Sequence, residues 1–347
     1  MGRRGLHLGV VGVGRIGAFH ARTLAGLEGV AALTLADADA ARAREVANEL
    51  GAAAVEAPAA IVDAGIDALV IATATPGHAP LLELAARAGL PAFCEKPVAL
   101  DLETLDDVLE EVERAGILVQ IGFQRRFDAG YRAAREAVAT GALGNLIAVR
   151  AATHDPAPPA EEYIAGSGGI FRDLHIHDFD AVRFVTCQDV IEVYADGAVR
   201  ETDWFARQGD VDTAAAVLRL EGGALGVLTG TRHDALGYDV RLEVFGSRDS
   251  IAVGVDARTP LRSVEPSVAA ATAPPVPAYA NFLERFAPAY ADELAAFVTA
   301  VRTGAPSPCP LAEGRAALLV ALAADRARAE RRPVSIEEVA SAQPVTG

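Results

Sequence analysis

Short apolar runs alternate with amphipathic helical segments along the first part of the chain. The runs, which lack polar alternation, are residues 6–11, 31–36, 68–72, 91–94 and 118–121. The segments between them, rich in Ala, Arg, Glu and Leu, include 18–27, 38–50, 80–88 and 102–115. Strands that are apolar throughout and separated by helices are typical of a parallel sheet covered on both faces. The pattern predicts a doubly wound α/β domain over residues 1–122.

The pattern changes after Gly122. Helices are expected at 129–139 and 171–184 and a strand at 146–152, and four runs of alternating apolar and polar residues follow at 191–197, 213–220, 224–230 and 238–245. Turns such as Glu221-Gly222-Gly223 between these runs favour antiparallel pairing. Two Ala-rich helices, at 289–302 and 311–328, close the pattern. We expect an α+β second domain over residues 123–347, whose C-terminal helices are candidates to pack back on the first domain.

Length and charge restrict the class of protein. A chain of 347 residues fits two domains. Its formal net charge of −16 would repel nucleic acids and anionic membrane surfaces. The sequence has no uncharged apolar stretch long enough to predict a membrane span. Three cysteines without C-x-x-C spacing suggest neither a disulfide framework nor a zinc ribbon. The N-terminal apolar run is broken by glycines and lacks a cleavage site, so we expect a cytoplasmic protein rather than an exported one.

A glycine-rich turn follows the first expected strand. Gly12-Val13-Gly14-Arg15-Ile16-Gly17 lies directly before a helical stretch. Glycines in this place allow a tight turn and let backbone N–H groups approach a pyrophosphate at the helix N-terminus. Asp37 follows Gly17 by 20 residues, the spacing of an acid that accepts hydrogen bonds from ribose hydroxyls. Its carboxylate would repel a 2′-phosphate, so we expect NAD rather than NADP, with Arg42 as a nearby group able to offset that charge.

One lysine stands out among the basic residues. Of the 31 lysines and arginines, a single one is lysine, Lys96. It lies in Cys94-Glu95-Lys96-Pro97, at the end of an expected parallel strand, where ligands of open α/β sheets bind. An ammonium is compact and can shift its pKa, whereas a guanidinium is a broad fork that stays protonated. Lys96 is therefore a candidate catalytic cation, and a lysine that simply survives on the surface is the alternative.

Residues 168–180 contain a second set of candidate catalytic side chains, an acid and two histidines. If this stretch is helical, Asp173 and His177 stand at i and i+4 on one face, where the carboxylate can orient and stabilise an imidazolium. His175 then points elsewhere and is expected to be a buried or helix-surface histidine. A strand would instead place His175 and His177 together as metal ligands, but the preceding glycines and the apolar spacing favour a helix, so we expect no metal. Oxidation of an alcohol by a nicotinamide needs a base and a cation near the alkoxide, and His177 and Lys96 suit these roles.

Several of these motifs, taken in order, resemble one family. Four motifs resemble those of the glucose-fructose oxidoreductase, inositol dehydrogenase and rhizopine catabolism (Gfo/Idh/MocA) family. They are the glycine turn with Asp37, Thr73-Ala-Thr75-Pro-Gly-His78, Glu95-Lys96-Pro97 and Asp173-x-x-x-His177. Gly122-Phe-Gln-Arg125-Arg126 and Ser167-Gly-Gly-Ile-Phe are similar to its inositol 2-dehydrogenase branch. The resemblance covers nearly the whole chain.

The resemblance implies an architecture and a set of site residues. It implies a Rossmann domain followed by an α+β domain with a large open, mostly antiparallel sheet, whose exposed face forms homotetramers. It also implies that Lys96 lies between nicotinamide and substrate, that His177 takes the hydroxyl proton, and that Asp173 supports it. The cofactor would be lined by Gly12, Gly14, Arg15, Ile16, Gly17, Asp37, Thr73, Thr75, His78, Glu95 and Lys96.

Departures from the branch fall where the substrate is expected. His154-Asp155-Pro156 stands where many inositol dehydrogenases have arginine before Asp-Pro, and Leu236 stands where they often have tyrosine before Gly-Tyr-Asp. The candidate substrate-binding residues are Arg126, His154, Asp155 and Tyr238.

We expect an NAD-dependent dehydrogenase that oxidises a secondary hydroxyl of a cyclitol or pyranose sugar to a ketone. One alternative is a sugar dehydrogenase that acts on an amino sugar or an aminoglycoside intermediate, which the negative charge would attract. Another is a non-catalytic NAD-dependent sensor or repressor. A third is an enzyme whose redox step is transient, so that NAD stays bound and no net NADH forms.

Overall fold

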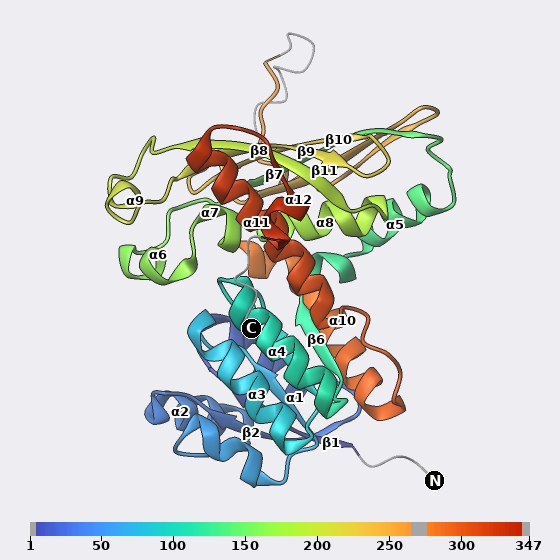
Figure 1. Ribbon diagram of the computed structural model, residues 1–347. Coiled ribbons are helices and arrows are strands. Elements are labelled where there is room, and N and C mark those ends of the chain that lie inside the picture. The colour runs from blue at the N-terminus through green and yellow to red at the C-terminus, as the bar shows by residue number, and fades with distance from the viewer. Residues whose placement is uncertain (1–4, 265–275, 342–347) are drawn as a thin grey trace. The chain divides into compact units, whose positions relative to one another are not determined.

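The computed structural model describes residues 5–264 and 276–341. The chain divides into two compact units, Met1–Gln124 with Pro288–Ala316 and Arg125–Ala287 with Ala317–Gly347. Each unit contains one sheet (Figure 1). Two long C-terminal helices, α10 (Phe282–Thr303) and α11 (Leu311–Glu330), each contribute residues to both units. None of the helices in the described part of the chain has the length and apolar character needed to cross a bilayer.

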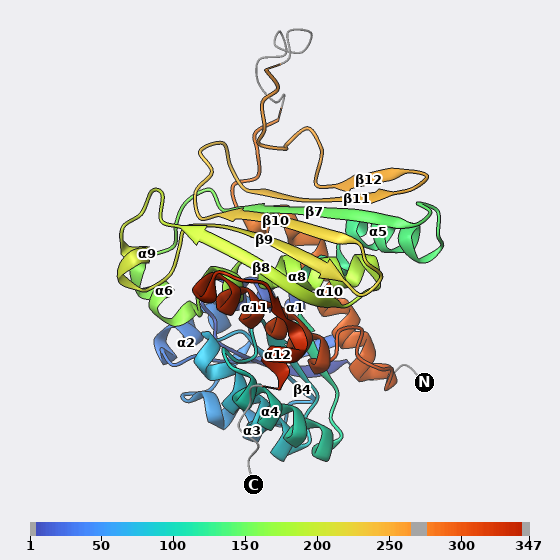
Figure 2. The ribbon, with the colours of Figure 1, turned by 45° about the horizontal axis from the view of Figure 1, so that its top comes forward.

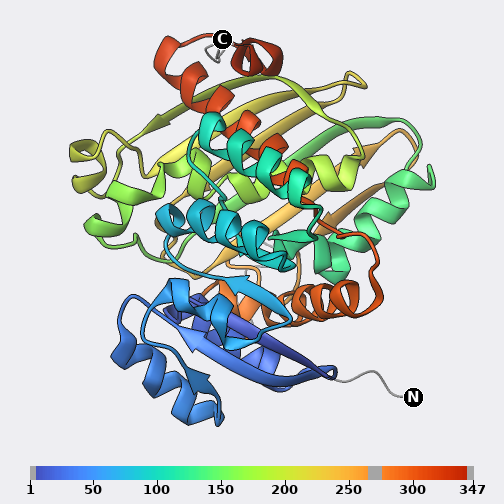
Figure 3. The same cartoon turned by 60° about the horizontal axis from the view of Figure 1, so that its bottom comes forward.

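The first unit contains a six-stranded parallel sheet in the order β3-β2-β1-β4-β5-β6. Its strands are β1 (Leu6–Val11), β2 (Val30–Ala36), β3 (Ala53–Ala54), β4 (Ala68–Ile71), β5 (Ala92–Glu95) and β6 (Val119–Gly122). The connecting α-helices, blue to teal in Figure 3, are α1 (Arg15–Ala25), α2 (Ala40–Leu50), α3 (His78–Ala88) and α4 (Leu102–Ala115). The predicted doubly wound domain is confirmed. Strands β1 to β3 are added toward one edge of the sheet and β4 to β6 toward the other, as in a Rossmann fold.

The uninterrupted apolar runs became the interior of this sheet. All residues of β4 and β5 are buried. Leu8 of β1, Leu24 of α1 and Phe93 of β5 share one core cluster with Phe297 of α10. Asp101 precedes helix α4 as its N-cap, and its carboxylate accepts a hydrogen bond from the Thr104 N–H. These contacts fix the carboxyl ends of the strands, where the candidate cofactor residues lie.

The second unit contains a seven-stranded, mostly antiparallel sheet in the order β12-β11-β7-β10-β9-β8-β13, as predicted for its class. Its strands are β7 (Leu146–His154), β8 (Val190–Ala198), β9 (Thr213–Leu220), β10 (Leu225–Thr231), β11 (Asp239–Gly246), β12 (Ser250–Val253) and β13 (Val334–Ser335). The expectation that consecutive strands pair is wrong at one place. Strand β7 lies between β10 and β11, and it is parallel to β10. Alternation defines which face a residue takes, but it does not encode which strand is the neighbour.

Helices lie on one face of this sheet. Figure 2 shows α5 (Ala129–Ala139) and α8 (Ile176–Thr186) on one side, and no helix of the unit's described part over the other side. Shorter helices are α6 (Glu161–Ser167), α7 (Ile170–Asp173), α9 (Trp204–Arg207) and α12 (Ile336–Ala340). Along β9 buried residues alternate with exposed ones. The sheet therefore has a covered inner face and an exposed outer face.

The helix expected at 171–184 is interrupted. It forms as α7 and α8, which are separated by a turn at Leu174 and His175. At this turn the His175 N–H donates to the Ile170 carbonyl, five residues earlier, at 2.9 Å. Such a widened turn shifts the side chains that follow relative to those before it, and turns of this kind are frequent at functional sites. Asp173 and His177 therefore lie on either side of the turn rather than on one continuous helix.

Candidate active site

The glycine turn between β1 and α1 is closely packed except at Gly14. A Cβ on Gly12, whose φ is +85°, would lie 2.6 Å from the Thr73 backbone nitrogen, and a Cβ on Gly17 would lie 1.8 Å from the Gly12 carbonyl oxygen. A Cβ on Gly14 would meet no atom within 4 Å. Arg15 and Ile16 begin α1, which has no side-chain cap at Gly14. The uncapped helix N-terminus and the open space beside it fit the pyrophosphate of a dinucleotide.

Asp37 directly follows β2 and is fixed by backbone hydrogen bonds. Its Oδ2 accepts the Val13 N–H at 2.7 Å, and its Oδ1 accepts the Asp39 N–H at 2.9 Å. The carboxylate therefore stands beside the glycine turn, where it can accept ribose hydroxyls. The half-exposed Arg42 places Nη1 3.6 Å from Asp37 Oδ1, so the offsetting group noted in the sequence is within ion-pair distance.

His78 bridges the segments that follow β4 and β5. Its Nδ1 lies 2.7 Å from the Pro97 carbonyl oxygen and its Nε2 lies 3.0 Å from the Thr73 carbonyl oxygen. Burial lowers the pKa of His78, and the two carbonyl oxygens only partly offset this effect. The ring is then neutral near pH 7, with its single proton best used in the shorter contact to Pro97. Thr75 begins the short 3₁₀ turn (Thr75–Gly77) that leads into His78.

Lys96 follows β5 and is half-buried. The preceding residue, Glu95, ends the strand and places Oε1 2.7 Å from Nε2 of the fully buried His20. The other oxygen of Glu95 accepts the Lys96 N–H at 3.3 Å. Glu95 thus binds the lysine backbone to the interior of the first unit, and His78 binds Pro97 on the other side. The single lysine is held at a strand end by neighbours on both sides of it in the chain.

Asp173 and His177 lie in the second unit. Asp173, at the end of α7, is 6% exposed and accepts hydrogen bonds on both oxygens. Tyr163 donates to Oδ1 at 2.8 Å and Arg232 Nη2 donates to Oδ2 at 2.7 Å. His177 lies in the first turn of α8 and is half-buried. The structure brings Asp173 into a network with two residues that the sequence did not single out, Tyr163 and Arg232.

His175 belongs to a separate buried network. The ring is fully buried, and its Nδ1 lies 2.8 Å from Asp178 Oδ2. The other oxygen of Asp178 accepts hydrogen bonds from Arg125 and from Thr153, the latter at 2.7 Å. Burial raises the pKa of Asp178, but Arg125 and His175 outweigh this effect and hold the pKa below its usual range. Within the described residues, no three His, Cys, Asp or Glu side chains are grouped to hold a metal ion.

The candidate substrate residues have partners of their own. Arg126 makes a buried bidentate ion pair with Asp180 and lies over the Phe184 ring. Asp155 Oδ2 lies 3.0 Å from Nη1 of Arg232. The fourth candidate, Tyr238, is buried beside β11.

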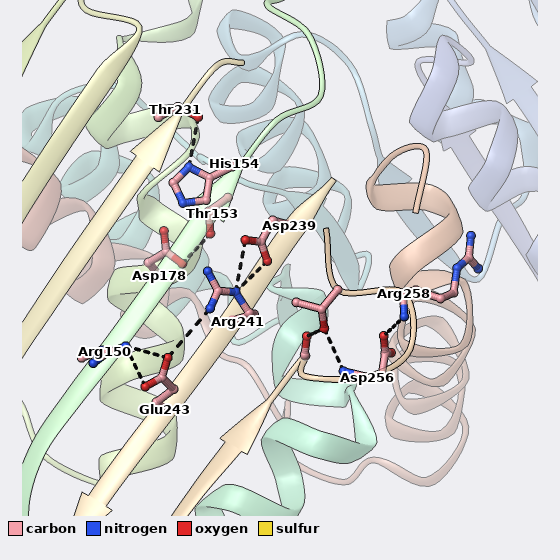
Figure 4. A network of polar contacts seen from close by, with 12 residues as sticks. Arg150, Thr153, His154, Asp178, Thr231, Asp239, Arg241, Glu243, Asp256 and Arg258 are labelled. Atoms are coloured by element: carbon pink, nitrogen blue, oxygen red, sulfur yellow. Dashed lines mark hydrogen bonds and ion pairs between the residues drawn. The ribbon is translucent and has the colours of Figure 1, made fainter. Parts of the chain in front are cut away.

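His154 lies at the end of β7 and pairs across the sheet. Its Nδ1 contacts Thr231 Oγ1 at 3.0 Å, as Figure 4 shows for the two neighbouring strands. Burial lowers the pKa of His154, which Asp239 and Asp234 partly offset. Among the four candidates, Asp155 joins the Asp173 network, because Arg232 contacts the carboxylates of both residues.

Tyr163 and Arg232 carried no distinctive signal in the sequence. Arg232 is one of 30 arginines, and residue type alone does not separate a buried arginine from a solvated one. Tyr163 lies in α6, a short helix without a clear periodic pattern. The available clue for Arg232 was its position two residues after the expected strand at 224–230 and before the Gly-Tyr-Asp segment.

Comparisons with known proteins agree with this arrangement. Residues 6–123 match an oxidoreductase family with an NAD-binding Rossmann fold, and residues 131–252 match the GFO/IDH/MocA C-terminal domain. The chain is 38% identical to a myo-inositol 2-dehydrogenase of Thermotoga maritima over 96% of this chain and 99% of that protein. It is 36% identical to an inositol 2-dehydrogenase of Rhizobium meliloti, over 95% and 99% of the two chains.

A solved structure resembles the whole chain as well. The crystal structure of scyllo-inositol dehydrogenase from Lactobacillus casei with bound NAD(H) and scyllo-inositol has a TM-score of 0.86 and 29% sequence identity, covering 96% of this chain and 100% of that one. Both matched family domains, the identity along nearly the full length and the shared fold lead to one conclusion. The chain belongs to the Gfo/Idh/MocA family of oxidoreductases, and its first unit is an NAD-binding Rossmann domain.

Proposed function

We propose that this protein is an NAD-dependent dehydrogenase that oxidises a secondary hydroxyl of a cyclitol to a ketone. The observation that carries the proposal is Lys96, the chain's single lysine, held at the end of β5 in a unit whose glycine turn and Asp37 fit a dinucleotide. Relatives named as inositol 2-dehydrogenases support the choice of a cyclitol as substrate.

In the proposed mechanism, different residues bind the cofactor, stabilise the developing charge and accept the proton. The glycine turn and the N-terminus of α1 would hold the pyrophosphate, and Asp37 would accept the ribose hydroxyls. Bound NAD supplies the hydride acceptor. The Lys96 ammonium donates a hydrogen bond to the reacting hydroxyl and stabilises the negative charge that develops on its oxygen. His177 takes the hydroxyl proton, and Asp173 stabilises the imidazolium that forms.

A preference for NAD over NADP follows from the same turn. Asp37 is fixed by the Val13 and Asp39 N–H groups, so its charge cannot rotate away from a 2′-phosphate. Arg42 is half-exposed and 3.6 Å from Asp37, so it offsets this charge weakly. We expect kcat/KM for NAD to exceed that for NADP at least tenfold.

Self-association is the second part of the proposal. On the outer face of the second sheet, Tyr194, Val217 and Val227 stand in register on β8, β9 and β10, and each is more than 40% exposed. An apolar row of this kind across adjacent strands is typical of a protein interface. We propose that this face joins copies of the chain into a homotetramer. We also propose a cytoplasmic location, which the three free cysteines support.

A substrate panel tests the activity. Purified protein is mixed with NAD and, in turn, myo-inositol, scyllo-inositol, glucose and an amino cyclitol, and NADH absorbance is followed. We expect sustained NADH formation with at least one inositol. The amino cyclitol tests the alternative suggested by His154 and Leu236, the two positions at which the sequence departs from the inositol branch. An absence of turnover with every compound would contradict the proposal. Tightly held NAD without net NADH would favour a transient redox step.

A further inference from the structure

We propose that Arg232 is a positioning residue for the reaction, which acts by holding Asp173 as a fixed anion. This inference rests on the proposed function, since it concerns how Asp173 supports His177. The guanidinium is 4% exposed and directly follows β10. Its Nη2 lies 2.7 Å from Asp173 Oδ2 and its Nη1 lies 3.0 Å from Asp155 Oδ2. One arginine fork therefore joins two carboxylates, an arrangement that a lysine ammonium cannot reproduce.

The position of Arg232 is itself fixed. Its backbone N–H donates to the Asp212 carbonyl at 2.7 Å. Burial lowers the pKa of Arg232, but Asp173 and Asp155 outweigh this effect and raise it above the ordinary value. The guanidinium is thus charged throughout the pH range in which the enzyme would work. A charged, buried and anchored fork fixes the direction of the Asp173 carboxylate.

Tyr163 completes the arrangement around Asp173. Its hydroxyl donates to Asp173 Oδ1 at 2.8 Å. Burial and the Asp173 charge both raise the pKa of Tyr163, so the phenol keeps its proton and remains a donor. The charged or titratable groups around Asp173 in these contacts are Arg232, Tyr163 and, through Arg232, Asp155. Both oxygens of Asp173 therefore face donors.

This arrangement separates the roles of Asp173 and His177. A carboxylate that accepts from a guanidinium and a phenol is stabilised as the anion and is a poor proton acceptor. The hydroxyl proton is left to His177, while the fixed Asp173 charge favours the imidazolium. The arginine sets the direction of the carboxylate, and through it the support that the histidine receives.

The first experiment is a double-mutant cycle on the full-length protein. Arg232→Gln, Asp173→Asn and the double variant are compared by kcat with the cyclitol that the wild type oxidises. Arg232→Gln should lower kcat by about 10- to 100-fold, the range for a lost hydrogen bond to a charged group, with the Kd for NAD unchanged. On the Asp173→Asn background, Arg232→Gln should change kcat less than about threefold, because Arg232 acts through Asp173. Independent, multiplicative losses would overturn the inference.

A second readout does not need turnover. Histidine labelled at Cε1 is followed by NMR against pH, and His177→Gln identifies the His177 signal among the chain's seven histidines. Arg232→Gln should move the His177 midpoint by about half a unit or more in the wild-type background and leave it unchanged in Asp173→Asn, because the arginine acts on the histidine through the Asp173 carboxylate. A midpoint that does not move in the wild-type background, or that moves equally in both backgrounds, would overturn the inference. Because this measurement is made without substrate, it distinguishes failure of the inference from failure of the proposed cyclitol activity.

Conservative variants keep the test decisive if Arg232→Gln does not fold. Arg232→Lys should retain an intermediate kcat, because an ammonium reaches one carboxylate but not both. Tyr163→Phe should lower kcat about tenfold, and it should lower the melting temperature no more than the control variant Tyr279→Phe does. The matched controls are Tyr279→Phe, which removes a 3.3 Å phenol bond to Asp256, and Arg183→Gln, which removes an ion pair with Asp189. Wild-type kcat in both Arg232→Lys and Tyr163→Phe would contradict the proposal.

Discussion

In the proposed mechanism Lys96 is the residue whose identity matters most, because its charge would have to occupy a small volume beside the reacting hydroxyl. Lys96→Arg keeps the charge but replaces a compact ammonium with a planar fork. We expect wild-type affinity for NAD, measured by quenching of protein fluorescence, and a loss of kcat of about 10²-fold or more, because oxyanion-type stabilisation depends on position. Near-normal turnover in this variant would show that charge alone is sufficient.

His177 is expected to act through proton transfer. His177→Ala should lower kcat by about 10²- to 10⁴-fold, the usual contribution of general acid–base catalysis. The wild-type rate should fall on the acid side of neutrality as the base becomes protonated, and this limb should be absent from the residual rate of the variant. His233→Ala, at a histidine outside the proposed machinery, is the control. A pH-independent wild-type rate between pH 5 and 9 would count against a titrating base.

Some residues of the site could be identified from sequence and others could not. Lys96 stood out because composition made it unique, and the glycine turn stood out because its spacing to Asp37 reflects the geometry of a bound dinucleotide. Arg232 and Tyr163 contact Asp173 only because the fold brings β10, α6 and α7 together. A contact that depends on the tertiary fold leaves no periodic pattern in a single sequence.

At the scale of elements, the join between β1 and α1 distinguishes a packing glycine from a binding glycine. A Cβ on Gly17 would lie 1.8 Å from the Gly12 carbonyl oxygen, so Gly17→Ala has to push α1 away from the strand. We expect a lower melting temperature and at least a tenfold weaker Kd for NAD. Gly14 has ordinary negative φ and open space, so Gly14→Ala should weaken NAD binding while the melting temperature stays near that of wild type. Equal effects of the two variants on stability would contradict this distinction.

A helix or strand could be predicted from sequence where it is buried on one face or on both faces, because each case leaves a recognisable pattern of apolar residues. The buried parallel strands β1, β4 and β5 match uninterrupted apolar runs within a residue or two at each end. The short strand β13 was missed, because two residues carry no period. The break between α7 and α8 was missed for another reason. Both turn residues, Leu174 and His175, keep helical dihedral angles, so the interruption lies in the hydrogen bonds rather than in residue type.

At the scale of the whole molecule, a half-buried acid makes stability depend on pH. The pKa of Asp325 is raised from 3.8 to about 6, because burial and the Asp210 charge raise it by more than Arg172 and Arg328 lower it. Since the folded-state pKa lies above the unfolded value, this contribution to stability is fully present below about pH 3.8 and is lost as the pH rises through about 6.

The substitution Asp325→Asn removes this ionisation. The free energy of unfolding of Asp325→Asn should be similar to that of wild type near pH 4 and exceed it by about 1–3 kcal/mol near pH 8. Urea unfolding at the two pH values measures the difference. Asp107→Asn, at an exposed position of α4, controls for the loss of charge alone. A difference between Asp325→Asn and wild type that stays constant with pH would contradict the assignment.

The exposed face of the second sheet gives a prediction about assembly. Val227 belongs to the apolar row with Val217 and Tyr194, so Val227→Glu places a charge in the proposed interface. Sedimentation should show the wild type as a homotetramer and Val227→Glu as a smaller species. The control is Val255→Glu, at a valine that is 61% exposed and outside the strands, and this variant should sediment like wild type. A monomeric wild type would contradict the proposed interface.

The central claim, hydride transfer from a cyclitol carbon to NAD, is tested most directly by following the hydrogen itself. The protein is incubated with NAD and scyllo-inositol or myo-inositol that carries deuterium on every ring carbon, and both products are analysed by mass spectrometry. We predict that deuterium appears on the reduced nicotinamide and that the cyclitol becomes a ketone lacking that deuterium. NAD that remains unreduced, or a cyclitol that keeps all its deuterium, would contradict the claim.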